Sequence, residues 1–242
     1  MTTPGINTYN EKALHLDLKA WYAQPADRFE TPVDGYIIDL VRGDLLVEIQ
    51  TRNFSAIRPK LTKLVEHHAV HLLFPIAQEK WLVNQTSDGA PAGSRRKSPK
   101  RGAVEHVFHE LVHIPTLLAH PNFSLEVLLI CEEELRRPNE QFRWRRRPWI
   151  TQERRLLQVM AQHRFVTPAD LMGLLPVGLS EPFTTADLAK ALAQPRPLAQ
   201  KMVYCLAKLN LLQMVGKQRN AILYQITTTT NSENNECHAA RQ

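Results

Sequence analysis

Two carboxylates, Asp39 and Glu48, lie in the run DGYIIDLVRGDLLVEIQ, where two apolar segments are joined by a Gly-Asp pair. Glycine accepts the positive φ that the first central position of a type II′ turn requires, so the run predicts an antiparallel hairpin. In that hairpin Arg42 pairs with Leu45, and counting back places Asp39 opposite Glu48. Directly opposite side chains share one face, with Cβ atoms about 5 Å apart. Two carboxylates at that spacing repel each other unless a cation lies between them, and oxygen ligands favour Mg²⁺ or Mn²⁺.

Asp39 together with Glu48-Ile49-Gln50 resembles the motif of the PD-(D/E)xK nuclease superfamily. In that superfamily an Asp and a Glu from adjacent strands hold a divalent metal, and a Lys two residues after the Glu is the usual third residue. Gln50 stands at the position of that Lys, as in known Gln variants of the superfamily. The resemblance implies that Asp39 and Glu48 bind Mg²⁺ or Mn²⁺, that the Ile49 carbonyl is a further ligand, and that Gln50 is a catalytic residue.

Two residues outside the hairpin are further candidates through the same resemblance. Some members of the superfamily place the catalytic Lys on the helix after the hairpin, and Lys60 lies early in a helix predicted over 56–67. Several branches carry an extra metal ligand on the helix before the sheet, a role that would fall on Glu11 in a helix predicted over 11–23. Other interpretations stay open, because Lys60 can be a solvated side chain and Glu11 an acid that suits the helix dipole.

The elements around these residues predict an α/β protein. Helices are expected over 11–23 and 56–67, and strands over 28–32, the two arms of the hairpin, 70–76, 80–84 and 123–130. Helix, three strands, helix, strand is the core order of the superfamily, and a helix between two strands makes a crossover. The resemblance therefore implies a restriction-endonuclease-like mixed sheet flanked by helices, in a domain spanning residues 1–135.

A second motif offers a different chemistry. The segment His109-Glu110-Leu111-Val112-His113 is an HExxH sequence, which in zinc peptidases places two His on one helical face with the Glu as general base. Glu133 could supply a third ligand. However, His106, His109 and His113 share the polar face of a helix predicted over 103–119, whereas a catalytic zinc helix is normally enclosed. A zinc peptidase is therefore one alternative function.

Two basic segments indicate a polyanionic partner. Residues 85–102 predict a loop that could clamp phosphates, with a solvated charge run as the alternative. Its cations are Arg95, Arg96, Lys97, Lys100 and Arg101. Residues 136–150 predict a basic linker in which Arg145 and Arg146 alternate with aromatic residues, a composition that suits contact with nucleic-acid backbone and bases.

Residues 151–226 resemble a winged helix-turn-helix domain. Helices are predicted over 151–163, 167–174, 186–193 and 197–209, followed by strands over 211–216 and 221–226. The resemblance implies that one face of the 197–209 helix enters the major groove of DNA and that the strand tip is the wing. These DNA-binding candidates are Gln200, Lys201, Tyr204 and Lys208 on the helix, with Lys217 and Arg219 on the wing. Protein docking is the alternative, and the polar residues 227–242 predict a disordered tail.

Composition limits the function classes. The 242 residues carry a formal net charge of +6, with a pI near 9.3, and 43% hydrophobic content is enough for a core. The charge favours nucleic acid, and we expect double-stranded DNA. A membrane partner is not expected because no apolar run is long enough to span a bilayer. Three widely separated cysteines suggest no disulfide framework, so a cytoplasmic protein is expected. A homodimer is one oligomeric state that the sequence leaves open.

The whole chain also resembles an uncharacterised bacterial family that joins such a nuclease-like core to a winged helix. The sequence therefore predicts a metal-dependent DNA nuclease with a DNA-binding module. One alternative is a non-catalytic DNA-binding regulator with a degenerate nuclease core, which Gln50 favours. The other is the zinc peptidase.

Overall fold

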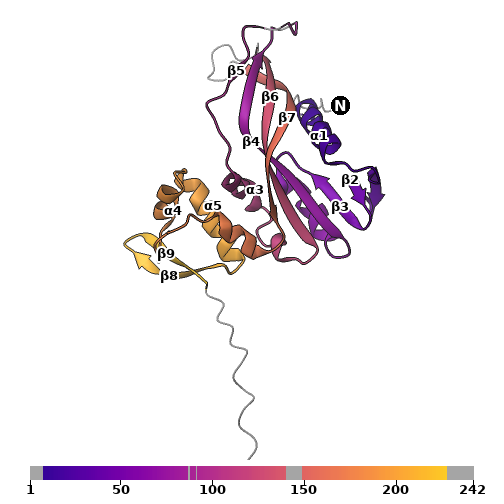
Figure 1. The fold of residues 1–242 in the computed structure, drawn as a ribbon. Helices are drawn as coiled ribbons and strands as arrows, with labels where there is room; N and C mark the ends of the chain where they lie inside the picture. Colours follow the sequence, from indigo (N-terminus) through magenta and orange to yellow (C-terminus); the bar gives the residue numbers. More distant parts are fainter. Residues whose placement is uncertain (1–7, 87, 91, 140–148, 228–242) are drawn as a thin grey trace, which may run out of the picture.

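The computed structural model describes residues 8–86, 88–90, 92–139 and 149–227 (Figure 1). The sheet-forming part contains α1 (Thr8–Tyr22), β1 (Arg28–Val33), β2 (Tyr36–Arg42), β3 (Leu45–Ile49), α2 (Phe54–Leu64), β4 (Ala69–Asn84), β5 (Arg96–Lys97), the 3-10 helix η1 (Val104–Val107), α3 (Phe108–Leu111), η2 (Leu117–Ala119), β6 (Phe123–Pro138) and β7 (Trp149–Phe165). The C-terminal part contains η4 (Pro168–Leu174), α4 (Thr185–Ala191), α5 (Arg196–Lys208), β8 (Leu212–Gln218) and β9 (Ala221–Ile226).

The chain is mixed α/β. Within the described residues, seven strands form one mixed sheet in the order β1-β2-β3-β4-β6-β7, with β5 paired to the outer part of β4. The first three strands are antiparallel neighbours, β3, β4 and β6 are parallel, and β7 returns antiparallel to β6. The helix α2 makes the crossover from β3 to β4, as a parallel pair requires.

Helices cover both faces of the sheet. On one face Leu14 and Leu18 of α1 pack with Leu40, Val47 and residues of β4 and β6 in a small apolar cluster. On the other face α2 and α3 pack against the same strands in a larger cluster. The strands carry apolar side chains on both faces because both are covered, which explains their nearly continuous hydrophobic sequences.

The C-terminal part packs against the α3 side of the sheet (Figure 1). Thr184 caps α4, accepting hydrogen bonds from the amides of Ala186 and Asp187, as its position before the helix predicts. A β-bridge joins Phe183 to Tyr224 beside the β8-β9 hairpin. Buried residues of this part, such as Leu206, belong to the same apolar cluster as the sheet, so the two parts share one core.

The helix predicted over 151–163 is wrong, because residues 149–165 form the long strand β7. This segment contains Glu, Arg, Leu, Gln and Met, which favour helices when packing does not decide. Pairing with β6 along nearly its whole length overrides that preference. Residues 151–165 therefore belong to the sheet rather than to a C-terminal helical unit, and residues 136–138 also lie in β6 rather than in a linker.

Two further element boundaries differ from those predicted. The strands predicted over 70–76 and 80–84 are one strand, β4, with a register irregularity between Ala77 and Glu79. The helix predicted over 103–119 is instead a series of short helical segments, η1, α3 and η2, of which α3 and η2 are separated by a segment that contains Pro115. Proline removes a backbone donor, so a continuous helix cannot pass through this segment undisturbed.

Candidate functional site

The β2-β3 hairpin has the predicted register. Arg42 pairs with Leu45, and Gly43 adopts a φ of 57°, which a residue with a side chain disfavours. Leu40 and Val47 form the pair farthest from the turn. Asp39 and Glu48 are the next residues away from the turn, at the point where the two strands part. This point lies in the middle of the sheet, because β3 continues its pairing with β4.

Asp39 is held by α1 and by the neighbouring strand. Its Oδ2 accepts the Ile49 backbone amide at 2.9 Å and lies 3.1 Å from His15 Nε2, and its Oδ1 lies 3.0 Å from Lys19 Nζ. Burial alone would raise the pKa of Asp39, but His15, the Ile49 amide and Lys19 outweigh it and lower the pKa to about 2. Asp39 is therefore a firmly ionised carboxylate.

Glu48 has a different environment. It is buried, with 6% of its surface exposed, and Lys60 Nζ of α2 lies 2.6 Å from its Oε1. Lys60 therefore partly compensates the charge of this buried carboxylate. Burial raises the pKa of Glu48 to about 7 against the attraction of Lys60, and the negative charge of Asp39 adds to the rise.

The two carboxylates contact helices that lie on different faces of the sheet. Ile38 and Leu40 belong to different apolar clusters, so the alternation of side chains breaks at Asp39. The carboxylate of Asp39 consequently contacts α1, while that of Glu48 contacts α2. The prediction that both lie on one undistorted face is wrong in this detail, although their charges remain close enough to affect each other.

The carboxylate oxygens of Asp39 and Glu48 are the type of ligand that a hard divalent cation binds. Two carboxylates with opposite pKa shifts lie on adjacent strands, and Lys60 contacts Oε1 of Glu48. Asp39 would have to exchange Lys19 or His15 for a divalent cation, because these two side chains now contact its oxygens. Across the described residues no group of three or more His, Cys, Asp or Glu side chains is arranged to hold a metal.

The other predicted site residues are divided. Lys60 lies at the site and also donates to the Ile37 carbonyl at 2.6 Å. The side-chain amide of Gln50 instead donates a hydrogen bond to the Asn53 carbonyl at 3.3 Å. The Ile49 amide contacts Asp39, whereas the side chain of Glu11 lies outside the described part of the chain.

The sequence reasoning missed Lys19. It is 5% exposed, contacts Asp39 and pairs with Glu30 of β1. A signal was present, because Lys19 follows His15 by four residues and such residues share one helical face. A buried lysine on the face that covers the hairpin predicts an acidic partner there.

The HExxH residues have structural contacts. Glu110 Oε2 accepts the Phe54 amide at 2.8 Å and so satisfies the N-terminus of α2. His109 lies beside His106, with ring centroids 5.8 Å apart. Glu133 lies on β6 and pairs with Arg95 at 2.7 Å. The Glu that a zinc peptidase needs as a free base is thus already engaged by a backbone amide.

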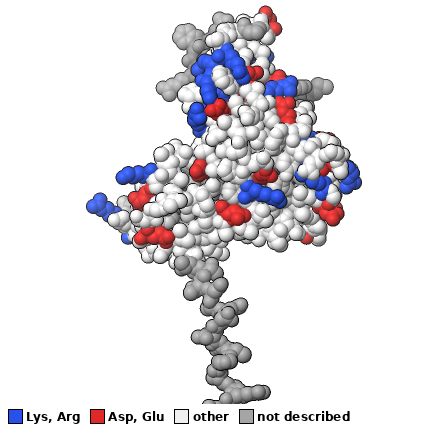
Figure 2. Space-filling model, viewed as in Figure 1, with Lys and Arg blue, Asp and Glu red and all other residues white. Residues whose placement is uncertain are grey.

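The basic loop is partly neutralised by glutamates of the sheet. Figure 2 shows Lys and Arg side chains over the outer ends of the long strands, with acidic side chains among them. Arg95 stacks on Trp81, with its guanidinium carbon 4.3 Å from the ring centre, while Lys97 and Arg101 pair with Glu79. Arg96 and Lys100 are exposed. Arg145 and Arg146 lie outside the described residues.

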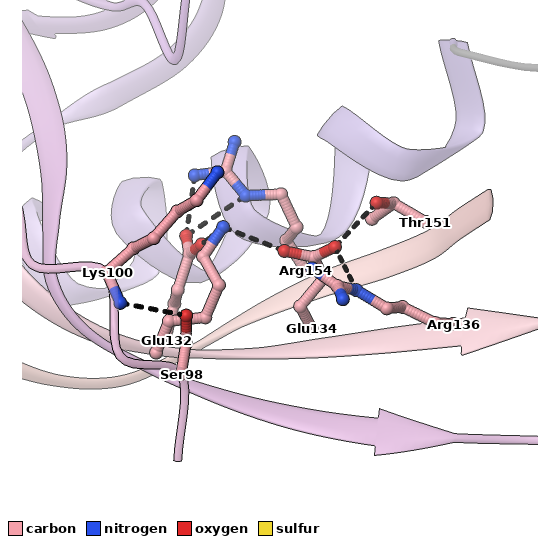
Figure 3. A network of polar contacts seen from close by, with 8 residues as sticks. Ser98, Lys100, Glu132, Glu134, Arg136, Thr151 and Arg154 are labelled. Atoms are coloured by element: carbon pink, nitrogen blue, oxygen red, sulfur yellow. Dashed lines mark hydrogen bonds and ion pairs between the residues drawn. The ribbon is translucent and has the colours of Figure 1, made fainter. Parts of the chain in front are cut away.

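A buried ion network lies beneath this loop (Figure 3). Glu132 is fully buried and pairs with Arg154 and with Lys80, the latter at 2.8 Å. Burial would raise the pKa of Glu134, but hydrogen bonds from Arg136, Lys80 and Thr151 lower it to about 2. These contacts tie together the strands β4, β6 and β7, which extend beyond the rest of the sheet.

The candidate DNA-binding face of α5 is only partly as predicted. Gln200, Tyr204 and Lys208 line a cavity of about 560 Å³ between α5 and the β8-β9 hairpin. Lys201 does not share that face, because its Nζ lies 3.4 Å from the His109 carbonyl of α3. Lys217 on β8 and Arg219 in the hairpin turn are both exposed.

A family model described as "Domain of unknown function (DUF8091)" matches residues 12–166, more than half of the chain. The chain belongs to this family. The DUF8091 region begins within α1 and ends directly after β7, so it coincides with the helix-covered sheet. Both carboxylates, Lys19 and Lys60 lie inside it.

One relative matches over most of its own length and most of this chain. An uncharacterized protein of Treponema pallidum (strain Nichols) is 32% identical over 187 residues, which cover 76% of this DUF8091 chain and 74% of that protein. No solved structure matches the chain. Among the described residues, none of the helices has the length and apolar character needed to cross a membrane.

Proposed function

We propose that this DUF8091 protein is a divalent-metal-dependent DNA nuclease with its catalytic centre at Asp39, Glu48 and Lys60. One observation carries the proposal: a buried and a half-buried carboxylate stand on adjacent strands where those strands part, and a lysine lies 2.6 Å from the buried one. A structural hairpin gains nothing from placing two acids of low exposure on adjacent strands, since each must be compensated at a cost.

The order of elements supports the same proposal. The chain runs α1-β1-β2-β3-α2-β4, which is the helix, three-strand, helix, strand order that the PD-(D/E)xK resemblance implies. The acidic residues stand on the second and third strands and Lys60 on the following helix, as in the members that move the lysine there.

Each residue would have a distinct role. Asp39 and Glu48, with the Ile49 carbonyl, would hold Mg²⁺ or Mn²⁺, which when bound supplies Lewis acidity to a phosphate and to water. Because the pKa of Glu48 is about 7, loss of its proton near neutral pH would prepare the site for a cation. The Lys60 ammonium, fixed by the Ile37 carbonyl, would orient the attacking water and stabilise negative charge on the phosphate.

The C-terminal part would bind double-stranded DNA as a winged-helix module. Gln200, Tyr204 and Lys208 converge on the cavity beside the hairpin, where Asn220 also lies. Amide, aromatic and ammonium groups on one exposed surface suit base edges and phosphates. Lys201 is excluded from this role because it faces α3.

A cleavage assay tests the nuclease. Supercoiled plasmid and single-stranded DNA are incubated with Mg²⁺, Mn²⁺ or EDTA, using the wild type, Asp39→Ala and Lys60→Met. We expect metal-dependent cleavage by the wild type only, with Mn²⁺ binding lost in Asp39→Ala and kept in Lys60→Met. Cleavage that persists in Asp39→Ala, or Mn²⁺ affinity unchanged by that substitution, would refute the assignment.

A second candidate is a non-catalytic DNA-binding regulator. It is favoured by the ion pair of Asp39 with Lys19, which compensates the carboxylate without a metal, and by Gln50, which contacts the Asn53 carbonyl. Calorimetry separates the candidates, because a regulator of this kind would bind duplex DNA yet show no saturable Mn²⁺ binding.

A further inference from the structure

A polar cavity lies at the C-terminal end of α1. It has a volume of about 580 Å³ and is lined by Trp21, Tyr22, Arg42, Glu126, Gln162 and Arg164, among others. These residues come from α1, β2, β6 and β7, so four elements contribute to one hollow. The volume is in the range of small-molecule sites in proteins.

Glu126 lines this cavity, and a buried histidine holds its carboxylate in place. Only 6% of its surface is exposed, and its Oε2 lies 2.9 Å from His71 Nε2. His71 Nδ1 in turn lies 2.7 Å from Ser124 Oγ, and the Tyr22 ring stacks on His71. A carboxylate held by a buried chain of this kind is preorganised as an acceptor for a ligand.

Two guanidinium groups stand beside this carboxylate. Arg42 lines the cavity and is anchored by Asp27 through its Nε and Nη2, at 2.9 and 2.8 Å, and by the Tyr22 carbonyl at 3.0 Å. Arg164 is opposite Glu126 in the register of β6 and β7. It is exposed, and within the described residues it has no hydrogen bond or ion pair.

We propose that this cavity binds a mononucleotide. Arg42 and Arg164 bind its phosphate monoester, Glu126 accepts a hydrogen bond from a hydroxyl or amino group, and Trp21 stacks on the base. Two guanidinium groups from separate strands match the several oxygens of a phosphate. Trp21 lines the cavity with 42% of its surface exposed, so an aromatic face is free to cover a flat ring.

The cavity carries charges of both signs, which favours an anion that also carries a hydrogen-bond donor. An anion alone would meet the Glu126 carboxylate as well as the arginines, and a neutral nucleoside would leave Arg164 without a partner. A phosphate linked to a sugar and a base can satisfy both signs of charge. The site is independent of the proposed nuclease centre, whose carboxylates contact other residues.

Calorimetry on the full chain in EDTA tests the proposal, since EDTA removes any contribution from a metal site. The probes are adenosine monophosphate, inorganic phosphate and adenosine. We expect adenosine monophosphate to bind at least about tenfold more tightly than either of the other two. Equal affinity for adenosine monophosphate and inorganic phosphate, or no binding of adenosine monophosphate, would overturn the proposal.

Two substitutions and a control locate the ligand. Arg164→Gln should weaken binding of adenosine monophosphate about tenfold or more, since it removes a charge-assisted contact. Trp21→Leu should weaken binding of adenosine monophosphate while leaving that of inorganic phosphate unchanged. Lys190→Gln changes the charge equally on an exposed residue of α4 and should have no effect. Unchanged affinity in Arg164→Gln, with the fold verified by thermal unfolding, would contradict the site.

Discussion

Glu48 should make the protein lose stability as the pH rises through neutrality. Its pKa is raised from 4.5 to about 7, mainly by burial, so folding disfavours its ionised form. A raised folded-state pKa contributes stability that is fully present below the unfolded value. That contribution is lost as the pH rises from about 4.5 to beyond 7.

The size of this loss follows from the shift. At about 1.4 kcal/mol per pKa unit, a rise from 4.5 to about 7 corresponds to about 3 kcal/mol of unfolding free energy. Glu48→Gln keeps the shape of the protonated acid but cannot ionise. The variant should match the wild type near pH 4.5 and exceed its unfolding free energy by about 3 kcal/mol above pH 8.

Urea unfolding of both proteins, followed by circular dichroism across this pH range, measures the difference. Glu66→Gln is the matched control, because Glu66 is an exposed acid just after α2 and should show no such dependence. A difference between wild type and Glu48→Gln that stays constant with pH would show that Glu48 does not titrate in this window. Added Mn²⁺ should stabilise the wild type more than the variant at high pH, because a cation favours the carboxylate.

Three further predictions concern other contacts. Glu110→Gln should lower the unfolding free energy by about 1 kcal/mol, through a weaker bond to the first turn of α2, while leaving any DNA cleavage intact. Lys208→Gln should weaken duplex DNA binding and reduce the dependence of log affinity on log salt by about one unit, whereas Lys201→Gln should not, as filter binding at several salt concentrations can measure. Arg154→Met should cost about 3 kcal/mol in urea unfolding, because it leaves the buried Glu132 with Lys80 alone.

The sequence predicted the hairpin and its register because local chemistry decides both. A Gly-Asp turn with apolar arms permits few pairings, and Arg42 does pair with Leu45. The contact of Lys60 with Glu48 could be anticipated only as one choice among helix lysines, since reach across a crossover depends on packing. The break in alternation at Asp39 was invisible in the sequence, because it arises where two strands separate around residues of α1.

The strand β7 could not be predicted from its own residues. Its residues favour a helix, and a long partner strand far back in the sequence decides otherwise. The same long-range effect removed Lys201 from the candidate DNA face, because α3 packs beside α5. The sequence shows that the loop is basic. How much of its positive charge is compensated depends on acidic neighbours such as Glu79 and Glu133, whose positions only the fold determines.

The single apolar core that joins the sheet to α4 and α5 has a consequence for cooperativity. Parts that share a core lose their packing together, so heating or denaturant should melt this chain in one transition rather than two. Any ligand of the α5 face would then protect the amides of β4 and β6 from hydrogen exchange, although it touches neither strand. A cut before β7 would leave each fragment with an exposed half of that core, and the strand itself would become an unpaired edge prone to association.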